Sequence, residues 1–387
     1  MGAKFSWKLL PGSILLSAAL LFSNCGPAGN GQQVGTGGGS GSGGGQVLYV
    51  TTTVQGSGQT TGAVAAFPIN STTGALGSAT TVIGPDSASS IVGNAAGTFL
   101  FVDDTTNLGA DVFSISGSGA LTAVSGSPFS TGVVTTGLAI DPAGKFLYAP
   151  SGTANSVNAY TVNSSNGALS AISGSPFAAG SGAWNGLVDP SGKFLFVSDS
   201  LNTSGGVAGF TINSSTGGLT AISGSPFATV SNGVPTAMAV TPAGTFLYVS
   251  ESLAGGIYGL AIGSGGALTA VQSSAFAPLT RPTSLVIDPA GQFLFSSNPT
   301  TSTISVFSIN AGTGVLTEVS GSPFSVSTAP SRLAIDTTGA FLYASNPTAG
   351  TVTGFAVNSS TGALTAFSAG PYAAGIQPQN LTVVKLP

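Results

Sequence analysis

Histidine is absent from this chain, cysteine occurs once, and charged residues of either sign are scarce. The 387 residues include 7 Lys and Arg and 11 Asp and Glu, which is about a fifth of the charged fraction usual in soluble domains. Without imidazole and with one thiol, the chain cannot build a Ser-His-Asp or Cys-His centre, or a structural zinc site. We therefore expect no metal, no cofactor and no catalytic residues of those classes.

The charge balance also excludes a class of partner. The net charge is −4 and the sequence contains no basic cluster, so a nucleic-acid partner is not expected. Surface polarity has to come from Ser, Thr, Asn and Gly, a composition that favours a protein working outside the cytoplasm.

The N-terminus has the features of an export signal. Lys4 and Lys8 precede an apolar run from Leu9 to Phe22, which is too short to span a bilayer but suits a signal peptide. The following Leu-Phe-Ser-Asn-Cys-Gly, around Cys25, resembles a bacterial lipobox, although Phe and Asn replace the more usual Leu and Gly or Ala. We expect residues 1–25 to be a lipoprotein signal with Cys25 as the lipidated residue. An ordinary cleaved signal and secretion is the alternative.

Residues 26–45 are almost entirely Gly, Ser, Gln, Asn and Thr. Such a composition cannot bury a core and behaves as a flexible linker. A tether directly after Cys25 suits a domain held at the surface of the bacterial cell envelope, on the periplasmic or the outer side.

From residue 46 onward the sequence repeats itself. The phrase Gly-Ser-Pro-Phe and its variants recur every 48 to 50 residues, and a second phrase, Asp-Pro-x-Gly-x-Phe-Leu-Tyr/Phe, recurs in step with it. Residues 46–387 comprise 342 residues, which is seven units of about 49. The aromatic residues of the first phrase are Phe129, Phe177, Phe227, Phe276, Phe324 and Tyr372.

Each unit contains four short apolar segments bounded by turn residues, which indicates strands. In one unit they are 284–287, 293–296, 303–309 and 315–324. Asp-Pro-x-Gly joins the first two segments, and Asn-Ser-Ser-Thr-Gly or its variants joins the last two, as hairpin turns. Every unit is therefore predicted to be a four-stranded antiparallel meander, and seven such units predict an all-β, seven-bladed propeller.

The phase of the repeat predicts how the ring closes. The repetitive part begins with a second-strand sequence, Gln46 to Val50, and ends with a first-strand sequence, Asn380 to Leu386. The C-terminal strand should therefore complete the N-terminal blade. An open β-solenoid is the alternative, and it would not require this match of phase.

These phrases are similar to those of a known family. Leu-Tyr-Val-Thr-Thr at 48–52, with the Asp-Pro-x-Gly-Lys-Phe-Leu-Tyr and Ser-Gly-Ser-Pro-Phe phrases, resembles the YVTN and lactonase seven-bladed propellers, which include 6-phosphogluconolactonase-like proteins. The resemblance implies a Pro-Arg-His triplet just before the innermost strand. The matching triplets here are 235–237, 282–284, 330–332 and 378–380, and none has both Arg and His. Arg332 occupies the histidine column, and Arg281 precedes its triplet.

Candidate ligand-binding residues lie at the ends of the strands. Both hairpin turns of a unit emerge on one face, so the irregular connections, which more often carry function, emerge on the other. A polar residue recurs there at the end of each second strand, at Thr52, Asp104, Ser151, Asp199, Glu251, Asn298 and Asn346. The candidates are Asp103, Asp104, Trp184, Asn185, Asp199, Glu251, Arg281 and Arg332. The alternative is that the strand-end residues only cap the following loops.

Two functions are compatible with these features. The first is a non-catalytic, monomeric envelope lipoprotein whose irregular face binds a protein or a glycan, favoured by the anchor and by the missing catalytic groups. The alternative is a divergent lactonase that hydrolyses a sugar or carboxylic lactone, favoured by the family resemblance.

Overall fold

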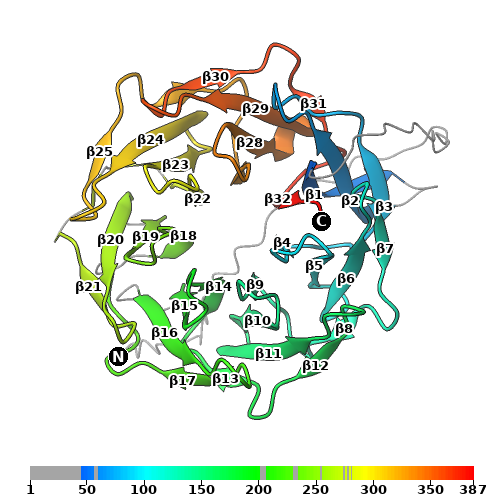
Figure 1. The fold of residues 1–387 in the computed structure, drawn as a ribbon, viewed down its shortest axis with the longest axis vertical. Helices are drawn as coiled ribbons and strands as arrows, with labels where there is room; N and C mark the ends of the chain where they lie inside the picture. Colours follow the sequence, from blue (N-terminus) through cyan, green and yellow to red (C-terminus); the bar gives the residue numbers. More distant parts are fainter. Residues whose placement is uncertain are drawn as a thin grey trace, which may run out of the picture.

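The computed structural model describes residues 45–55, 60–200, 206–229, 234–252, 255–272, 275–276, 279 and 281–387. Seven antiparallel sheets are arranged as blades around a central axis (Figure 1). The predicted signal, Cys25 and most of the predicted linker lie outside the described residues.

The seven blades follow the chain order. Blade 1 contains β1 (Gln46–Gln55), β2 (Thr60–Ile69), β3 (Thr80–Ile83) and β32 (Leu381–Lys385). Blade 2 contains β4 (Ile91–Gly93), β5 (Phe99–Asp104), β6 (Gly109–Ile115), β7 (Leu121–Ala123) and β8 (Phe129–Ser130). Blade 3 contains β9 (Ala139–Ile140), β10 (Phe146–Ser151), β11 (Ser156–Val162), β12 (Leu169–Ala171) and β13 (Phe177–Ala178).

The remaining four blades repeat the pattern. Blade 4 contains β14 (Ala183–Val188), β15 (Phe194–Asp199), β16 (Gly206–Ile212) and β17 (Leu219–Ala221), and blade 5 contains β18 (Pro235–Val240), β19 (Phe246–Glu251), β20 (Ile257–Ile262) and β21 (Leu268–Ala270). Blade 6 contains β22 (Ser284–Ile287), β23 (Phe293–Asn298), β24 (Thr303–Ile309), β25 (Leu316–Glu318) and β26 (Phe324–Ser325). Blade 7 contains β27 (Leu333–Ile335), β28 (Phe341–Asn346), β29 (Thr351–Val357), β30 (Leu364–Ala366) and β31 (Tyr372–Ala373).

The predicted closure of the ring is confirmed. β32 pairs with β1 in antiparallel register, with Lys385 opposite Gln46 and Leu381 opposite Val50. The main-chain N–H of Thr51 extends the ladder to the carbonyl of Asn380 at 2.9 Å. The C-terminal strand is thus the innermost strand of blade 1, and the sheet order is β3-β2-β1-β32 (Figure 1).

In blades 2, 3, 6 and 7 the fourth segment differs from the prediction, which was one continuous strand. In blade 6 it is divided into β25 and β26, and both pair with β24. Gly321 lies between them at a φ of +87°, a conformation that favours glycine. The chain therefore turns inside the Ser-Gly-Ser-Pro phrase before it rejoins the sheet.

The core lies between adjacent blades. On the second strand a tyrosine in every other blade donates its hydroxyl to a glycine carbonyl in the outer hairpin of the next blade, for example Tyr248 to Gly314 at 2.8 Å. Tyr49, Tyr148 and Tyr343 make the same bond, whereas blades 2, 4 and 6 carry phenylalanine at this position. These side chains are completely buried and tie neighbouring blades together.

Helical structure is minimal. The described residues contain one short 3₁₀ helix, Pro347–Ala349. None of them forms a helix with the length and apolar character needed to cross a membrane.

Candidate functional site: an axial cavity

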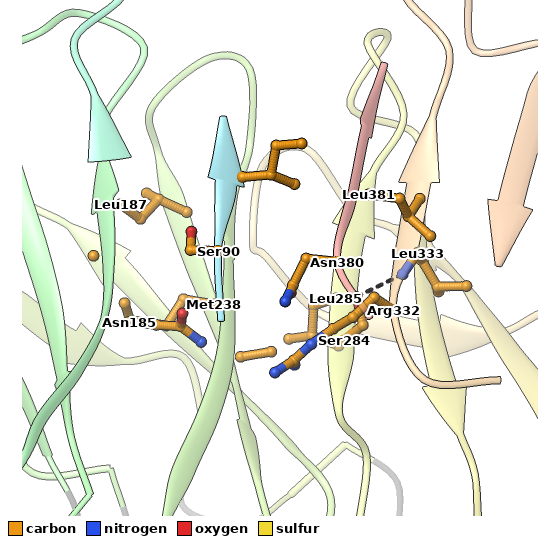
Figure 2. Close-up of a pocket in the computed structure, with 13 residues that line it drawn as sticks. Ser90, Asn185, Leu187, Met238, Ser284, Leu285, Arg332, Leu333, Asn380 and Leu381 are labelled. Atoms are coloured by element: carbon orange, nitrogen blue, oxygen red, sulfur yellow. Dashed lines mark hydrogen bonds between the residues drawn. The ribbon is translucent and has the colours of Figure 1, made fainter. Parts of the chain in front are cut away.

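The innermost strands of six blades begin around a common cavity on the axis, here called the axial cavity. Its volume is about 170 Å³. Its polar lining side chains are Ser90, Asn185, Ser284, Arg332 and Asn380, which Figure 2 shows converging from different blades. The apolar part of its wall is formed by Ile91, Leu187, Ala237, Met238, Leu285, Leu333 and Leu381.

A set of buried hydroxyls positions these residues. They occupy the position just before the recurring strand-end residue in five of the seven second strands, and we call Thr51, Ser198, Ser250, Ser297 and Ser345 the hydroxyl belt. Ser345 accepts the main-chain N–H of Arg332 at 3.1 Å, and Ser198 accepts that of Asn185 at 3.0 Å. Thr51 accepts that of Asn380, Ser250 accepts that of Ala237, and Ser297 bonds to the Thr283 hydroxyl. The belt therefore holds the start of the innermost strand at the cavity wall in blades 1, 4, 5, 6 and 7.

Arg332 is the cation of the axial cavity. Its side chain is partly buried, and its Nη1 donates a hydrogen bond to the carbonyl of Thr283 in the neighbouring blade. Burial lowers the pKa of the guanidinium, which still remains charged at neutral pH because arginine does not lose its proton in proteins. None of the lining residues that the structure describes is acidic. The cavity wall thus presents a positive charge and, among its described lining residues, no carboxylate.

The other polar lining residues retain hydrogen-bonding capacity. The hydroxyls of Ser90 and Ser284 accept the main-chain N–H groups of Leu138 and Leu333 at 3.0 Å each, and each hydroxyl still has a proton to donate. Asn185 donates its Nδ2 to the carbonyl of Thr236 at 2.6 Å. Among the described residues, nothing is bonded to the side-chain amide of Asn380. These groups can bind carbonyl and hydroxyl oxygens.

The predicted candidates at the ends of the second strands do not line the axial cavity. Asp104 is 1% exposed and caps the loop that follows it, accepting the main-chain N–H groups of Thr106 and Asn107. Glu251 is fully buried and accepts the Thr229 hydroxyl at 2.5 Å. Burial raises its pKa to about 7. Asp199, also buried, ends β15 opposite Ala183. The contacts of Asp104 agree with the alternative interpretation, in which a strand-end residue caps the loop that follows it.

The remaining candidates are divided between the cavity and its surroundings. Asn185 and Arg332 line the cavity, whereas Arg281 is exposed, with a φ of +54°, and is not part of the wall. Trp184, next to Asn185, is 40% exposed, at a point where the pairing of β14 with β15 shifts register. Asp103 is completely buried behind Ser90.

The described residues contain no group of three or more side chains able to hold a metal ion. The described side chains that line the cavity offer one guanidinium together with hydroxyl and amide groups.

Part of the chain matches a known protein family. The family model described as "Lactonase, 7-bladed beta-propeller" matches residues 137–329. The chain belongs to the lactonase family of seven-bladed β-propellers. The match covers blades 3 to 6 of this lactonase-family propeller, including the Asn185 and Ser284 walls of the cavity.

Solved structures share the whole fold. A putative 6-phosphogluconolactonase from Bacteroides uniformis has a TM-score of 0.75 and 18% identity, and covers 88% of this chain and 99% of its own. The periplasmic gluconolactonase of Pseudomonas aeruginosa has a TM-score of 0.71 and 17% identity, and covers 88% of this chain and 100% of its own. Among curated proteins no match was found. At these identities the likeness to solved structures shows the fold of this lactonase-family chain.

Sequence reasoning missed Ser90, Ser284 and Asn380 as site residues. Ser284 and Asn380 occupy the third position of the Pro-x-x triplets, the same column as Arg332. That column was noted in the sequence, but Ser284 and Asn380 are small and neutral, so charged residues at the strand ends were chosen as candidates instead. Ser90 gave no such signal, because Ala88-Ser89-Ser90 takes the place of a Pro-x-x triplet there.

Proposed function

We propose that this protein hydrolyses a small lactone bound in the axial cavity, with Arg332 as the group that binds the lactone carbonyl oxygen. The observation that carries the proposal is the placement of Arg332, the one cation among the described lining residues, on the axis of a lactonase-family propeller. The gluconolactonase and putative 6-phosphogluconolactonase folds support the same reaction class.

Arg332 and the serine hydroxyls suit this chemistry. When water adds to the lactone carbonyl carbon, negative charge develops on the carbonyl oxygen, and fixed donors stabilise that charge. Arg332 and the hydroxyl of Ser284 or Ser90 supply such donors. The carbon–oxygen bond of the ring then breaks, the ring oxygen gains a proton, and the product is a hydroxy acid.

The size and charge of the cavity favour a single-ring lactone without a phosphate group. A volume of about 170 Å³ is below the 300–1,000 Å³ common for ligand pockets. A phosphate is usually bound by several cations. Lys145 and Lys193 lie beside hairpin turns at the opposite end of the strands, and Lys385 ends β32 there. Arg281 lies outside the cavity wall.

Steady-state hydrolysis tests this proposal. Purified residues 26–387 would be assayed in a pH-stat with glucono-1,5-lactone and its 6-phosphate, after subtraction of spontaneous hydrolysis. We expect the neutral lactone to be the better substrate. Arg332→Met should lower kcat/KM roughly 100- to 1,000-fold, the usual cost of losing an oxyanion donor. Arg281→Met is the matched control and should change it less than about twofold. Hydrolysis that survives in Arg332→Met would refute the proposed role.

A binding protein without catalysis is the second candidate. The observation in its favour is that no Asp, Glu, Lys or Cys is among the described lining residues, so no side chain there is suited to act as a general base at neutral pH. In that case calorimetry would detect saturable binding of aldonic acids or lactones that Arg332→Met abolishes, and the pH-stat would detect no turnover.

The predicted export and anchoring complete the proposal. We propose that Cys25 carries lipid and holds the propeller at the bacterial envelope. Mass spectrometry of the mature protein would find acyl groups on Cys25 and would find none after Cys25→Ser. An unmodified N-terminus would favour the secreted alternative.

A further inference from the structure

We infer that Asp103 is a positioning residue of the axial cavity, whose carboxylate holds the Ser89–Ser90 segment against the cavity and makes ligand affinity depend on its ionisation. This inference rests on the proposed function for its kinetic readout, and on the geometry of blade 2 for everything else.

Asp103 replaces a hydroxyl of the belt. It occupies the penultimate position of β5, where blades 1, 4, 5, 6 and 7 have Thr or Ser and blade 3 has Pro150. The belt hydroxyls of blades 1, 4, 5 and 7 each accept one main-chain N–H from the start of an innermost strand. Blade 2 performs the same task with an ionisable group.

The contacts of Asp103 are more numerous than those of the hydroxyls. Its Oδ1 accepts the main-chain N–H groups of Ser89 at 2.7 Å and of Ser90 at 2.6 Å. Its Oδ2 accepts the Ser89 hydroxyl, and its own N–H donates to the Ser90 carbonyl at 3.2 Å. Ser90 lines the cavity and accepts the N–H of Leu138 from blade 3. The carboxylate of Asp103 thus contacts Ser90, and Ser90 in turn lines the cavity and joins blade 2 to blade 3.

The surroundings of Asp103 bring the pKa of its carboxyl close to neutral pH. Burial raises its pKa to about 7, the hydrogen bonds from Ser89 and Ser90 lower it, and the charge of Asp104 adds a further small rise. The other carboxylates of this region are Asp111 on β6 and Asp86 before β4, and Arg332 lies across the cavity. Hydrogen bonds to a charged acceptor are roughly twice as strong as those to a neutral one. The ionised form therefore holds Ser90 more firmly.

Variants at this position separate positioning from simple support. Asp103→Ser installs the residue that blades 4 to 7 use and keeps a single acceptor without ionisation. Asp103→Asn keeps the size and shape of the side chain but cannot ionise. Glu251→Gln is the matched control, because Glu251 is also buried with a raised pKa but does not contact the cavity.

Kinetics and amide resonances would be followed from about pH 5.5 to about pH 8.5, which brackets the expected transition. In the wild type we expect KM for the neutral lactone to fall roughly two- to tenfold as the pH rises through about 7, the range that one hydrogen bond accounts for. The value of kcat should change little. Asp103→Ser and Asp103→Asn should lose the inflection, and Glu251→Gln should keep it.

The main-chain amide resonance of Ser90 gives a readout that does not require turnover. It should shift with a midpoint near pH 7 in the wild type and in Glu251→Gln, and should not shift in Asp103→Ser. The inference is wrong if the inflection in KM or the amide shift persists in Asp103→Ser. If no lactone is hydrolysed or bound, the proposed function fails, and the amide resonance still decides the role of Asp103.

Discussion

The two ends of the propeller strands use similar residues in different ways. At the end with the hairpin turns, six blades repeat one contact: the first residue of the turn accepts main-chain N–H groups at the start of the second strand. Asp288 accepts those of Gln292 at 2.7 Å and Phe293 at 2.6 Å. Asn94, Asp141, Asp189, Thr241 and Asp336 occupy the same position.

At the opposite end, around the axial cavity, the blades differ from one another. The column that lines the cavity contains serine, asparagine, alanine and one arginine, and the column behind it contains five hydroxyls, one proline and one carboxylate. A residue that recurs in every blade serves the scaffold that all blades share. A residue that occurs in one blade, such as Arg332 or Asp103, cannot be explained by that scaffold and is the better functional candidate.

The largest expected effect concerns the titration of buried acids near the cavity end. Asp103 and Glu251 have pKa values raised to about 7 by burial, so between pH 4 and pH 7 the folded state binds more protons than the unfolded state. Stability must therefore fall as the pH rises through that window. At about 1.4 kcal/mol per pKa unit, we expect the two acids together to account for a loss on the order of 5–10 kcal/mol.

Urea unfolding at several pH values measures this fall. The double variant Asp103→Ser, Glu251→Gln should show a flat profile over the same window. A wild-type profile that rises from pH 4 to pH 7 would mean that these two acids are ionised well below neutrality.

The next effect concerns the scaffold end. Asp288→Ala removes the acceptor of the main-chain N–H groups of Gln292 and Phe293, of which the second is buried, and should cost about 1–3 kcal/mol of stability, with kcat/KM of the folded protein unchanged. Asp288→Asn is the matched control, since Asn94 fills this position in blade 2 and accepts both N–H groups at 2.9 Å. A fall in kcat/KM that exceeds the loss of folded protein would contradict the assignment of the hairpin end to stability alone.

The smallest effect concerns the contacts between blades. Tyr248→Phe leaves the carbonyl of Gly314 without its buried hydroxyl partner and should cost about 0.5–1.5 kcal/mol, measured by chemical denaturation. Tyr372→Phe is the control, because the Tyr372 hydroxyl is buried without a partner among the described residues. Equal losses for the two variants would show that the hydroxyl bond between blades contributes nothing.

The repeat allowed most of the fold to be predicted. Turn residues and alternating apolar strands are local signals, so the hairpins, the number of blades and the strand that closes the ring follow from their spacing. The interruption between β25 and β26 was missed, because a serine-rich phrase with apolar neighbours does not reveal where pairing stops.

The site was less predictable. Two of the sequence candidates, Asn185 and Arg332, line the axial cavity. Asp104, Asp199 and Glu251, which were chosen because they share a register at strand ends, do not line it. A shared register means that the residues occupy the same position along their strands. It does not determine whether their side chains face the axis or the loop that follows.

The sequence by itself determined a seven-fold β-meander, its closure and the two kinds of strand end, because each depends on contacts within one repeat or on the period between repeats. Only the tertiary structure decided which column of side chains faces the axis, and that Arg332 lines one cavity together with Asn185, Ser284 and Asn380. Those residues come from different blades and approach one another only when the ring closes, so their proximity is a property of the curvature of the ring and not of any local pattern.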